Sequence, residues 1–483
     1  MKLSALLDEV ETKAATAQEV EISGITDCSA EVEKGNLFVC VVGRHADGHA
    51  FAEQAAARGA AALLTQRPLP IALPQVTVDD PRRAYAQLCA AFNGNPAQRL
   101  RLTAVTGTNG KTSTAWLLRH ILCQSGCKTG LIGTIPEASS HWRETAHYTT
   151  PAPPRLHAML QDMVANGITC AVTEASSQAL QQQRLAGLQF ACGVFTNLSP
   201  EHLDYHSSME DYYAAKRMLF EQCDQAVINI DSPWGARLTR EVRCRTVTVS
   251  AQYSMADYYI SQPVFTARDT EFTLTHGALS CTIQLPLAGQ YHVYNAACAV
   301  AAAAAYEVPM RVAANSLEHV PSVPGRLERL PLAVPFDVFI DYAHTPEALE
   351  QTLRSLRAVC RGRLICVFGC GGDRDRTKRP LMGKIAAKLS HFTIITNDNP
   401  RTEDEAQILD DIERGMQSTP HLRITDRATA IETAVRQARE NDTVLIAGKG
   451  HEQYQLLRDG AHPFNEYQIA ADAAQKWKKE RTV

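Results

Sequence analysis

The first run along the chain whose residue types suggest chemistry is glycine-rich and spans 106–113, with the sequence TGTNGKTS. A strand-like stretch precedes the run and a helical stretch follows it, so its backbone N–H groups can face a phosphate at a helix N-terminus. Lys111 can reach the outer phosphates, and Thr112 can bind Mg²⁺. The run is shorter than the common GxxxxGK[ST] loop, because Val105 stands five residues before Gly110. We predict a nucleotide site formed by Gly107, Thr108, Asn109, Gly110, Lys111, Thr112 and Ser113.

A carboxylate follows the strand predicted at 170–173. Glu174 would stand at the carboxyl end of that strand, where open α/β sheets bind their ligands. A carboxylate near a phosphate loop is suited to Mg²⁺. The alternative is a solvated loop glutamate.

A polar loop at 197–206 carries two histidines and two carboxylates. These side chains could bind metal or phosphate, and from the residues alone an ordinary polar loop is an equal alternative. Lys216 lies in the helical run that follows, where helix periodicity alone predicts a surface lysine.

Strand-like and helical stretches alternate along the chain, and these elements must position the candidate residues. The alternation predicts an α/β protein with parallel sheets. Breaks at 93–96 (NGNP) and 321–325 divide the 483 residues into three expected domains. We expect an N-terminal domain at 1–98, a central P-loop parallel-sheet ATPase domain at 99–325, and a C-terminal doubly wound, Rossmann-like domain at 326–483. The segment 247–287 alternates polar and apolar residues, which favours an antiparallel appendix.

The composition excludes several classes of partner. With 48 basic against 52 acidic residues, the net charge of −4 gives no reason to expect nucleic acid or an anionic membrane. The 14 scattered cysteines contain no CxxC pair, which favours reduced thiols over a zinc site. The alanine-rich run at 296–306 is about half the length of a membrane span, so it predicts a close-packed helix. We expect a cytoplasmic monomer without membrane insertion.

Taken in order, these motifs resemble those of the Mur ligase family, from about residue 24 to residue 454. The phosphate loop matches the family pattern GTNGK[ST], and the polar loop is similar to TNLxxDHLDYH with Glu201 in place of Asp. The run 289–295 is similar to GxxNxxN, with His292 in place of the first Asn. Further matches are the lysine segment 213–216, the hinge 324–328 and the run 341–346.

The resemblance implies a role for each of these motifs. Lys216 would be carbamylated, which turns a cation into a carboxylate-like ligand, and Mg²⁺ would be held by Thr112, Glu174, His202 and Lys216. The expected catalytic residues are Lys111, Glu174, His202 and Lys216. The remaining contacts to ATP would come from Asn295 to the adenine and from Arg326 and Asp341.

Three C-terminal motifs resemble the member that adds the third peptide residue: 371–375 (GGDRD), 398–401 (DNPR) and 448–452 (GKGHE). That reaction joins meso-diaminopimelate to UDP-N-acetylmuramoyl-L-alanyl-D-glutamate in peptidoglycan synthesis. Diaminopimelate differs from lysine by a second carboxylate, which guanidinium groups would pair. An acidic group would bind its distal ammonium. The expected site comprises Arg374, Asp398, Asn399, Pro400, Arg401, Gly448 and Glu452.

The resemblance also implies which residues contact the UDP-muramoyl-dipeptide. Four positions depart from the family pattern: Cys28 and Ala30 flank the serine of a DSR motif, Tyr148 replaces Asn, and Pro151 stands where some members carry Gly. The expected contacts are Asp27, Ser29, Arg44, His45, Ala46, Thr149, Thr150, Ser176, Gln182 and Arg184.

Competing functions were an L-lysine-adding Mur ligase, a folylpolyglutamate synthase, a catalytically inactive nucleotide-binding partner and a plain P-loop NTPase or kinase. The complete DNPR run argues against the first two. An inactive partner would tend to lose Lys111, Glu174 or Lys216, and all three are present. The expected chemistry is attack of the D-glutamyl carboxylate on the γ-phosphate, followed by attack of the amine on the acyl phosphate.

Overall fold

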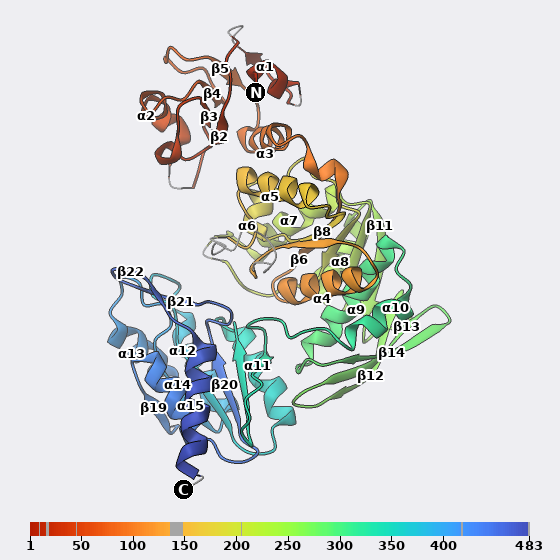
Figure 1. The fold of residues 1–483 in the computed structure, drawn as a ribbon, viewed down its shortest axis with the longest axis vertical. Helices are drawn as coiled ribbons and strands as arrows, with labels where there is room; N and C mark the ends of the chain where they lie inside the picture. The colour runs from red at the N-terminus through yellow and green to blue at the C-terminus, as the bar shows by residue number, and fades with distance from the viewer. Residues whose placement is uncertain are drawn as a thin grey trace.

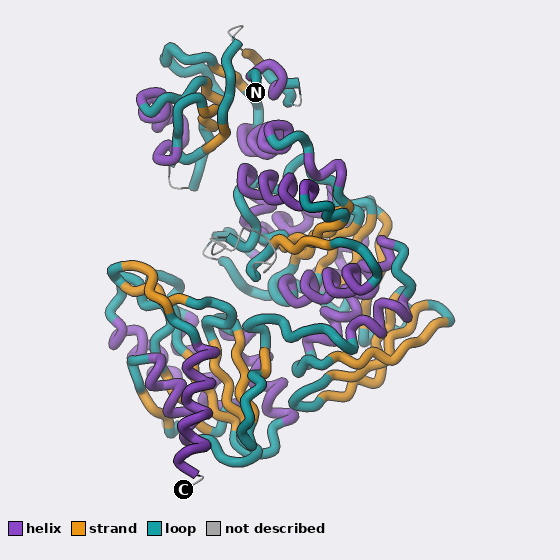
Figure 2. Tube along the Cα trace, in the orientation of Figure 1, coloured by secondary structure: helices purple, strands orange, loops and turns teal. Residues whose placement is uncertain are grey.

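The computed structural model describes residues 1–8, 10–15, 19–44, 46–135, 148–203, 205–416 and 419–481. Its described strands form three large sheets and a small hairpin, which lie one after another along an elongated chain (Figure 1). Helices cover the sheets, as the prediction of an α/β protein required (Figure 2).

The N-terminal sheet has five strands in the order β1-β5-β4-β3-β2. Strands β2 to β5 are parallel, and the short β1 pairs antiparallel with β5. Its strands are β1 (Ala14–Ala15), β2 (Gly24–Thr26), β3 (Asn36–Val39), β4 (Ala62–Thr65) and β5 (Gln75–Thr77). Its helices are α1 (Leu3–Leu7), α2 (Ala52–Ala57) and α3 (Pro81–Phe92), and α3 packs against α5 (Pro153–Ala165) of the central region.

The central sheet has nine strands in the order β14-β13-β12-β11-β10-β9-β6-β8-β7. Its parallel part comprises β6 (Arg101–Thr106), β7 (Thr129–Ile132), β8 (Cys170–Glu174), β9 (Cys192–Phe195), β10 (Gln225–Asn229) and β11 (Arg245–Ser250). Strands β12 (Tyr258–Phe265), β13 (Thr270–His276) and β14 (Leu279–Leu285) extend it. The helices around it are α4 (Lys111–Gln124), α6 (Ser177–Gln181), α7 (Met209–Arg217), α8 (Pro233–Glu241), α9 (Tyr291–Ala303) and α10 (Met310–Leu317).

The expectation of an antiparallel segment at 247–287 is wrong at its start. Strand β11 is parallel to β10, and β12 joins parallel to β11, so only β12 to β14 form an antiparallel unit. The unit also continues the central sheet and is not a separate appendix. Alternating polarity reports which faces of a strand are buried and says nothing about strand direction, which explains the error.

The C-terminal sheet has the order β15-β16-β20-β17-β18-β19, and all its pairs are parallel except β15 with β16. Its strands are β15 (Glu328–Arg329), β16 (Asp337–Asp341), β17 (Leu364–Phe368), β18 (Phe392–Ile395), β19 (His421–Arg423) and β20 (Thr443–Ala447). The helices are α11 (Pro346–Val359), α12 (Lys378–Leu389), α13 (Glu405–Met416), α14 (Arg427–Gln437) and α15 (Glu466–Arg481). A hairpin of β21 (Tyr454–Leu457) and β22 (Gly460–Pro463) precedes α15.

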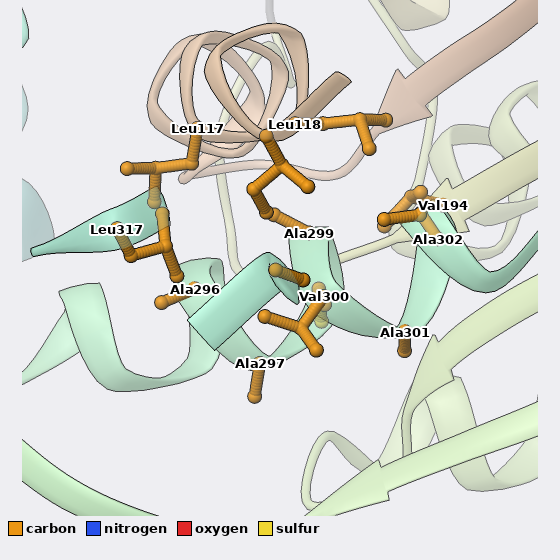
Figure 3. Packing of buried hydrophobic residues seen from close by; sticks show 14 of the residues in the cluster. Leu117, Leu118, Val194, Ala296, Ala297, Ala299, Val300, Ala301, Ala302 and Leu317 are labelled. Atoms are coloured by element: carbon orange, nitrogen blue, oxygen red, sulfur yellow. The ribbon is translucent and has the colours of Figure 1, made fainter. Parts of the chain in front are cut away.

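The alanine-rich helix α9 packs closely in the core, as its composition predicted. Ala296 and Ala299 are fully buried, and they lie beneath Leu117 and Leu118 of α4 in Figure 3. Small side chains let the two helix backbones approach, which places α4 and the phosphate loop firmly over the sheet. Among the described residues, no helix is both long enough and apolar enough to cross a membrane.

Candidate active site

A cleft of about 560 Å³ opens between the central and C-terminal sheets. The phosphate loop lines one side, together with Glu174, Glu201 and His202. The link that follows β16, from Asp341 to Thr345, lines the other side. Both walls are built from carboxyl ends of parallel strands, the edge where such sheets bind ligands.

The phosphate loop turns at two glycines with left-handed backbone. Gly107 has φ 145° and Gly110 has φ 88°, and a Cβ at these positions would collide with the Thr196 hydroxyl and the Asn295 carboxamide. Lys111 folds over the loop, since its Nζ donates to the carbonyls of Gly107 and Thr108 at 2.9 and 2.8 Å. Burial lowers the pKa of Lys111, and the carboxylates of Glu201 and Glu174 oppose that shift.

Thr112 and Glu174, both predicted to bind Mg²⁺, are in direct contact. The Thr112 hydroxyl donates to Glu174 Oε2 at 2.8 Å, and Glu174 is 1% exposed. Thr134 donates to the same carboxylate through its backbone N at 2.7 Å and its hydroxyl at 3.2 Å. Sequence reasoning missed Thr134, although its place just beyond β7, the neighbour of β8, was a usable signal.

Lys216 is buried, so the surface position predicted from helix periodicity is wrong. The side chain is 1% exposed, and its Nζ donates to the Gly107 carbonyl at 2.8 Å. It lies 4.6 Å from the centroid of the Tyr212 ring. Burial, reinforced by the Lys111 cation, lowers the pKa of Lys216 well below its ordinary value. Helix periodicity could not predict this burial, because the face of α7 that carries Lys216 packs under the phosphate loop.

The histidines of the polar loop separate into two environments. His202 borders the cleft, and its Nε2 lies 3.9 Å from Glu201 Oε1. His206 is 1% exposed, and its Nε2 shares a hydrogen bond of 2.9 Å with the Ser177 hydroxyl, which indicates a structural role. Asp204 lies outside the described residues.

The expected adenine end of the cleft has polar atoms that lack partners. The buried Nδ2 of Asn295 and Nε of Arg326 have no hydrogen-bond partner among the described residues. Arg326 instead stacks 4.5 Å from the Tyr342 ring centroid and donates to the Thr112 hydroxyl at 3.1 Å. Asp341 accepts hydrogen bonds from the backbone N of Leu327 and Ala343, and its main role here is to hold the hinge.

His292, which departs from the adenine motif, does not line the cleft. It is fully buried, and both ring nitrogens lack a partner among the described residues. Burial lowers its pKa to about 3, so the ring is neutral. The residue that departs from the motif therefore lies on the buried side of α9 and not at the cleft.

The candidate amino-acid site gathers around the DNPR run. Arg401 has φ 54°, which is strained for arginine, and its Nη1 donates to the Gly372 carbonyl at 2.8 Å. The Arg401 guanidinium and the Arg374 side-chain stem both lie beside Gly371. Burial and the Arg374 cation lower the pKa of Arg401. The carboxylates of Asp398, Glu452 and Asp373 oppose that lowering, so the site presents cationic and acidic groups together.

Acidic groups lie on the other side of that site. Glu452 Oε2 accepts from Asn399 Nδ2 at 3.0 Å and from Lys449 Nζ at 3.0 Å. Asp398 Oδ2 is buried without a partner among the described residues, and a Cβ on Gly448 would press against it. Lys449 was part of the GKGHE motif but was not predicted as a site residue. Its full burial between Asn399 and Glu452 shows that it orders the acidic groups.

The candidate dipeptide contacts form a connected network beside Glu174. Thr150 donates to the Glu174 carbonyl at 2.7 Å and accepts from the backbone N of Ser176 at 3.0 Å. Arg184 donates to the Thr150 carbonyl at 2.7 Å and to Gln182 Oε1 at 2.8 Å. The Thr149 and Thr134 hydroxyl oxygens lie 3.2 Å apart, within hydrogen-bond distance.

The residues expected at the UDP end lie on the N-terminal domain. Asp27 accepts a 3.2 Å hydrogen bond from Tyr85, and the Ser29 hydroxyl donates to Gln54 at 3.0 Å. The Arg44 guanidinium lies 5.6 Å from the ring centroid of Tyr205, which links this domain to the central polar loop. His45 lies outside the described residues, and Ala46 follows it.

Comparisons with known proteins agree along the whole chain. Family models match at 21–93 (Mur ligase family, catalytic domain), 105–303 (Mur ligase middle domain) and 325–450 (Mur ligase, glutamate ligase domain). The UDP-N-acetylmuramoyl-L-alanyl-D-glutamate–2,6-diaminopimelate ligase of Halalkalibacterium halodurans is 40% identical and aligns over 99% of this chain and 100% of its own. Ligase 1 of that name from Clostridium acetobutylicum is 38% identical over 98% and 99%.

The similarity to solved structures also points to the Mur ligases. A structure of a UDP-N-acetylmuramoyl-L-alanyl-D-glutamate–2,6-diaminopimelate ligase matches with a TM-score of 0.71 at 31% identity, covering 99% of this chain and 100% of that one. A MurF ligase from Thermotoga maritima in complex with ADP matches with a TM-score of 0.62 at 17% identity, covering 95% and 98%, and supports the fold alone. The fold, the ordered motifs and these matches establish that the chain belongs to the Mur ligase family.

Proposed function

We propose that this enzyme uses ATP to join meso-diaminopimelate to UDP-N-acetylmuramoyl-L-alanyl-D-glutamate in peptidoglycan synthesis. The observation that carries the substrate assignment is the placement of Arg374 and Arg401 beside Gly371, with the carboxylates of Asp398 and Glu452 close enough to act on the Arg401 charge. The full-length relatives named for this reaction support it. We assign residues 1–98 to the UDP end, 99–325 to ATP and 326–483 to the amino acid.

Selection of diaminopimelate over lysine follows from charge. The guanidiniums of Arg374 and Arg401 would pair the carboxylate that lysine lacks. The unpartnered Asp398 oxygen and Glu452 would bind the neighbouring ammonium. A lysine substrate would lack this carboxylate, so the exposed Arg374 and the half-buried Arg401 would lose a charge-assisted partner.

The residues at the phosphate loop fit a Mg²⁺ ion. Thr112 and Glu174 present a hydroxyl and a carboxylate oxygen 2.8 Å apart, and oxygen donors are those that Mg²⁺ prefers. Among the described residues, no group of three His, Cys, Asp or Glu side chains is arranged to hold a metal. His202, which lines the same cleft, and a carbamylated Lys216 beneath the phosphate loop would supply the further ligands. Bound Mg²⁺ would offset the charge that accumulates on the transferred phosphoryl group.

Carbamylation of Lys216 is favoured by its surroundings. A lysine with a lowered pKa carries a free amine, which is the form that adds to carbon dioxide. The product would be an anion directed at Gly107 and Lys111. The Lys111 cation would pair with it and so offset the cost of burying it.

Different residues of the chain would then act at successive steps of the reaction. The network of Thr150, Ser176 and Arg184 would hold the dipeptide so that its D-glutamyl carboxylate faces the γ-phosphate. Lys111 would bind the outer phosphate oxygens and reduce the repulsion between the two anions. Phosphoryl transfer gives an acyl phosphate, whose carbonyl carbon is then attacked by the amine as phosphate leaves. Holding the amine against that carbon can supply about 7–11 kcal/mol.

We place the enzyme in the cytoplasm as a monomer, where ATP is supplied and cysteines stay reduced. The 14 cysteines are all free, and eight of them are buried, which fits a reducing compartment. The test of the reaction is phosphate release with ATP, Mg²⁺, the UDP-muramoyl-dipeptide and diaminopimelate. Release that needs both the dipeptide and the amine supports the ligase. Release from ATP alone would indicate a plain NTPase, and none at all would indicate an inactive partner.

A further inference from the structure

We propose that His344 is the general base that removes a proton from the attacking ammonium of the amino-acid substrate. The proposal rests on the ligase function proposed above, and it concerns a residue with no role in that account so far. His344 stands in the short link between β16 and α11, at the carboxyl end of the strand, and it lines the cleft. Glu201 and His202 of the central wall line the same cleft.

Hydrogen bonding fixes the tautomer of His344. Its Nδ1 lies 2.8 Å from the backbone carbonyl of Tyr342, and a carbonyl can only accept, so Nδ1 carries the proton. Nε2 is therefore the unprotonated nitrogen with a free lone pair. This arrangement, with one ring nitrogen bonded to a carbonyl, is how proteins orient an imidazole for proton transfer.

The position of the ring is held on both sides. Lys378 Nζ donates to the backbone carbonyl of His344 at 2.8 Å, which ties the link to α12. The Tyr342 ring packs edge-on against the imidazole with centroids 4.7 Å apart. Tyr342 is itself covered by Arg326 and His451. A base must be fixed in this way to meet a proton at hydrogen-bond distance.

The surrounding charges keep the ring neutral before the reaction. Burial and then the Lys378 cation lower the pKa of His344, while Glu201, the Tyr342 carbonyl and Asp398 oppose the shift. A neutral imidazole is the form that can accept a proton. His344 lines the same cleft as Glu201 and the phosphate loop, so an amine that reaches an acyl phosphate in this cleft passes the ring.

The chemical step balances without another reactant. The ammonium nitrogen gives one proton to His344 Nε2 and so gains a free electron pair. That pair forms the N–C bond to the acyl carbon, and the C–O bond to phosphate breaks with its electrons on the departing phosphate. The nitrogen's second excess proton and the imidazolium proton leave to water after the amide has formed.

The test compares two nucleophiles on the full-length enzyme. Hydroxylamine attacks acyl phosphates as the free base already present at neutral pH, whereas diaminopimelate arrives as an ammonium. The variant His344→Asn keeps a donor for the Tyr342 carbonyl and removes the basic nitrogen. We expect the kcat with diaminopimelate to fall by about 10²-fold or more. Hydroxamate formation with hydroxylamine should stay within about threefold of wild type, which also shows that the variant folds and makes the acyl phosphate.

Measuring the activity of His344→Asn over a range of pH distinguishes a general base from a residue that only positions the substrate. Raising the pH supplies more free amine, so the defect of His344→Asn with diaminopimelate should shrink toward high pH. The control His421→Gln, in the same domain and paired with Glu413 away from the cleft, should leave both reactions unchanged. Equal losses with both nucleophiles, or a defect that does not change with pH, would overturn the role of His344. Absence of hydroxamate with wild-type enzyme would instead overturn the proposed ligase reaction.

Discussion

The Thr112 hydroxyl donates a 2.8 Å hydrogen bond to Glu174 Oε2, which joins the first turn of α4 to the last residue of β8. The phosphate loop and the carboxylate are 62 positions apart in the chain, and the parallel pairing of β6 with β8 brings them together. The pair forms the centre of the proposed magnesium site, so changing it should affect catalysis more than folding.

Glu174→Gln keeps the shape of the side chain and removes its charge. We expect kcat to fall by about 10²-fold or more, because less negative charge remains to hold the ion that stabilises the transferred phosphoryl group. The measurement is kcat at several Mg²⁺ concentrations, with thermal melting as a folding check. The exposed Glu221→Gln is the matched control. Unchanged kcat and Mg²⁺ dependence would remove Glu174 from the site.

Lys216→Ala and Lys216→Arg together test the carbamate. Arginine keeps a cation at the buried position but cannot be carbamylated in the same way, so both variants should lose kcat by about 10²-fold or more. Enzyme equilibrated with ¹³C-labelled bicarbonate should show a carbamate signal by NMR that is absent from both variants. An active Lys216→Arg enzyme would mean that the residue serves as a cation.

Arg401→Lys tests the recognition of diaminopimelate. Lysine retains one charge but not the planar pair of donors, so the KM for diaminopimelate should rise by about tenfold or more while the KM for ATP stays constant. The control Arg423→Lys changes a surface arginine of the same domain, which pairs with Asp410. An unchanged diaminopimelate KM in Arg401→Lys would remove Arg401 from substrate recognition.

Two ion pairs between α14 and α15 should differ in their contribution to stability. Arg427 and Glu466 are both fully buried, whereas Arg436 and Glu480 are about half exposed. Arg427→Met should lower the free energy of unfolding by about 3–5 kcal/mol, because it leaves a buried carboxylate unpaired. Arg436→Met should cost less than about 1 kcal/mol. Urea unfolding of both variants measures the difference, and equal losses would contradict the argument from burial.

Local sequence patterns predicted much of the fold. The run 170–173 was predicted as a strand and lies in β8, and the phosphate loop stands between β6 and α4 as expected. The direction of β11 was not predictable, because polarity patterns record burial and not strand order. Sheet order itself depends on pairings between distant segments, such as β6 between β8 and β9.

The candidate site was only partly accessible from the residues alone. The phosphate loop and Glu174 have local signals, a glycine pattern and the end of a strand. Lys216 has none, because its burial depends on how α7 packs beneath the loop, and it was found only through the family resemblance. Thr134 contacts Glu174, 40 positions away, and Lys449 contacts Asn399, 50 positions away, and only the three-dimensional arrangement reveals these contacts.

The most direct test of the central claim is phosphate release by the wild-type enzyme with ATP, Mg²⁺ and the UDP-muramoyl-dipeptide, comparing meso-diaminopimelate with L-lysine. Two guanidiniums around Gly371 predict a kcat/KM for diaminopimelate at least about 10²-fold higher than that for lysine, given about 1.5–3 kcal/mol for a hydrogen bond to a charged group. Equal or faster release with lysine would leave the family assignment intact and contradict the proposed substrate.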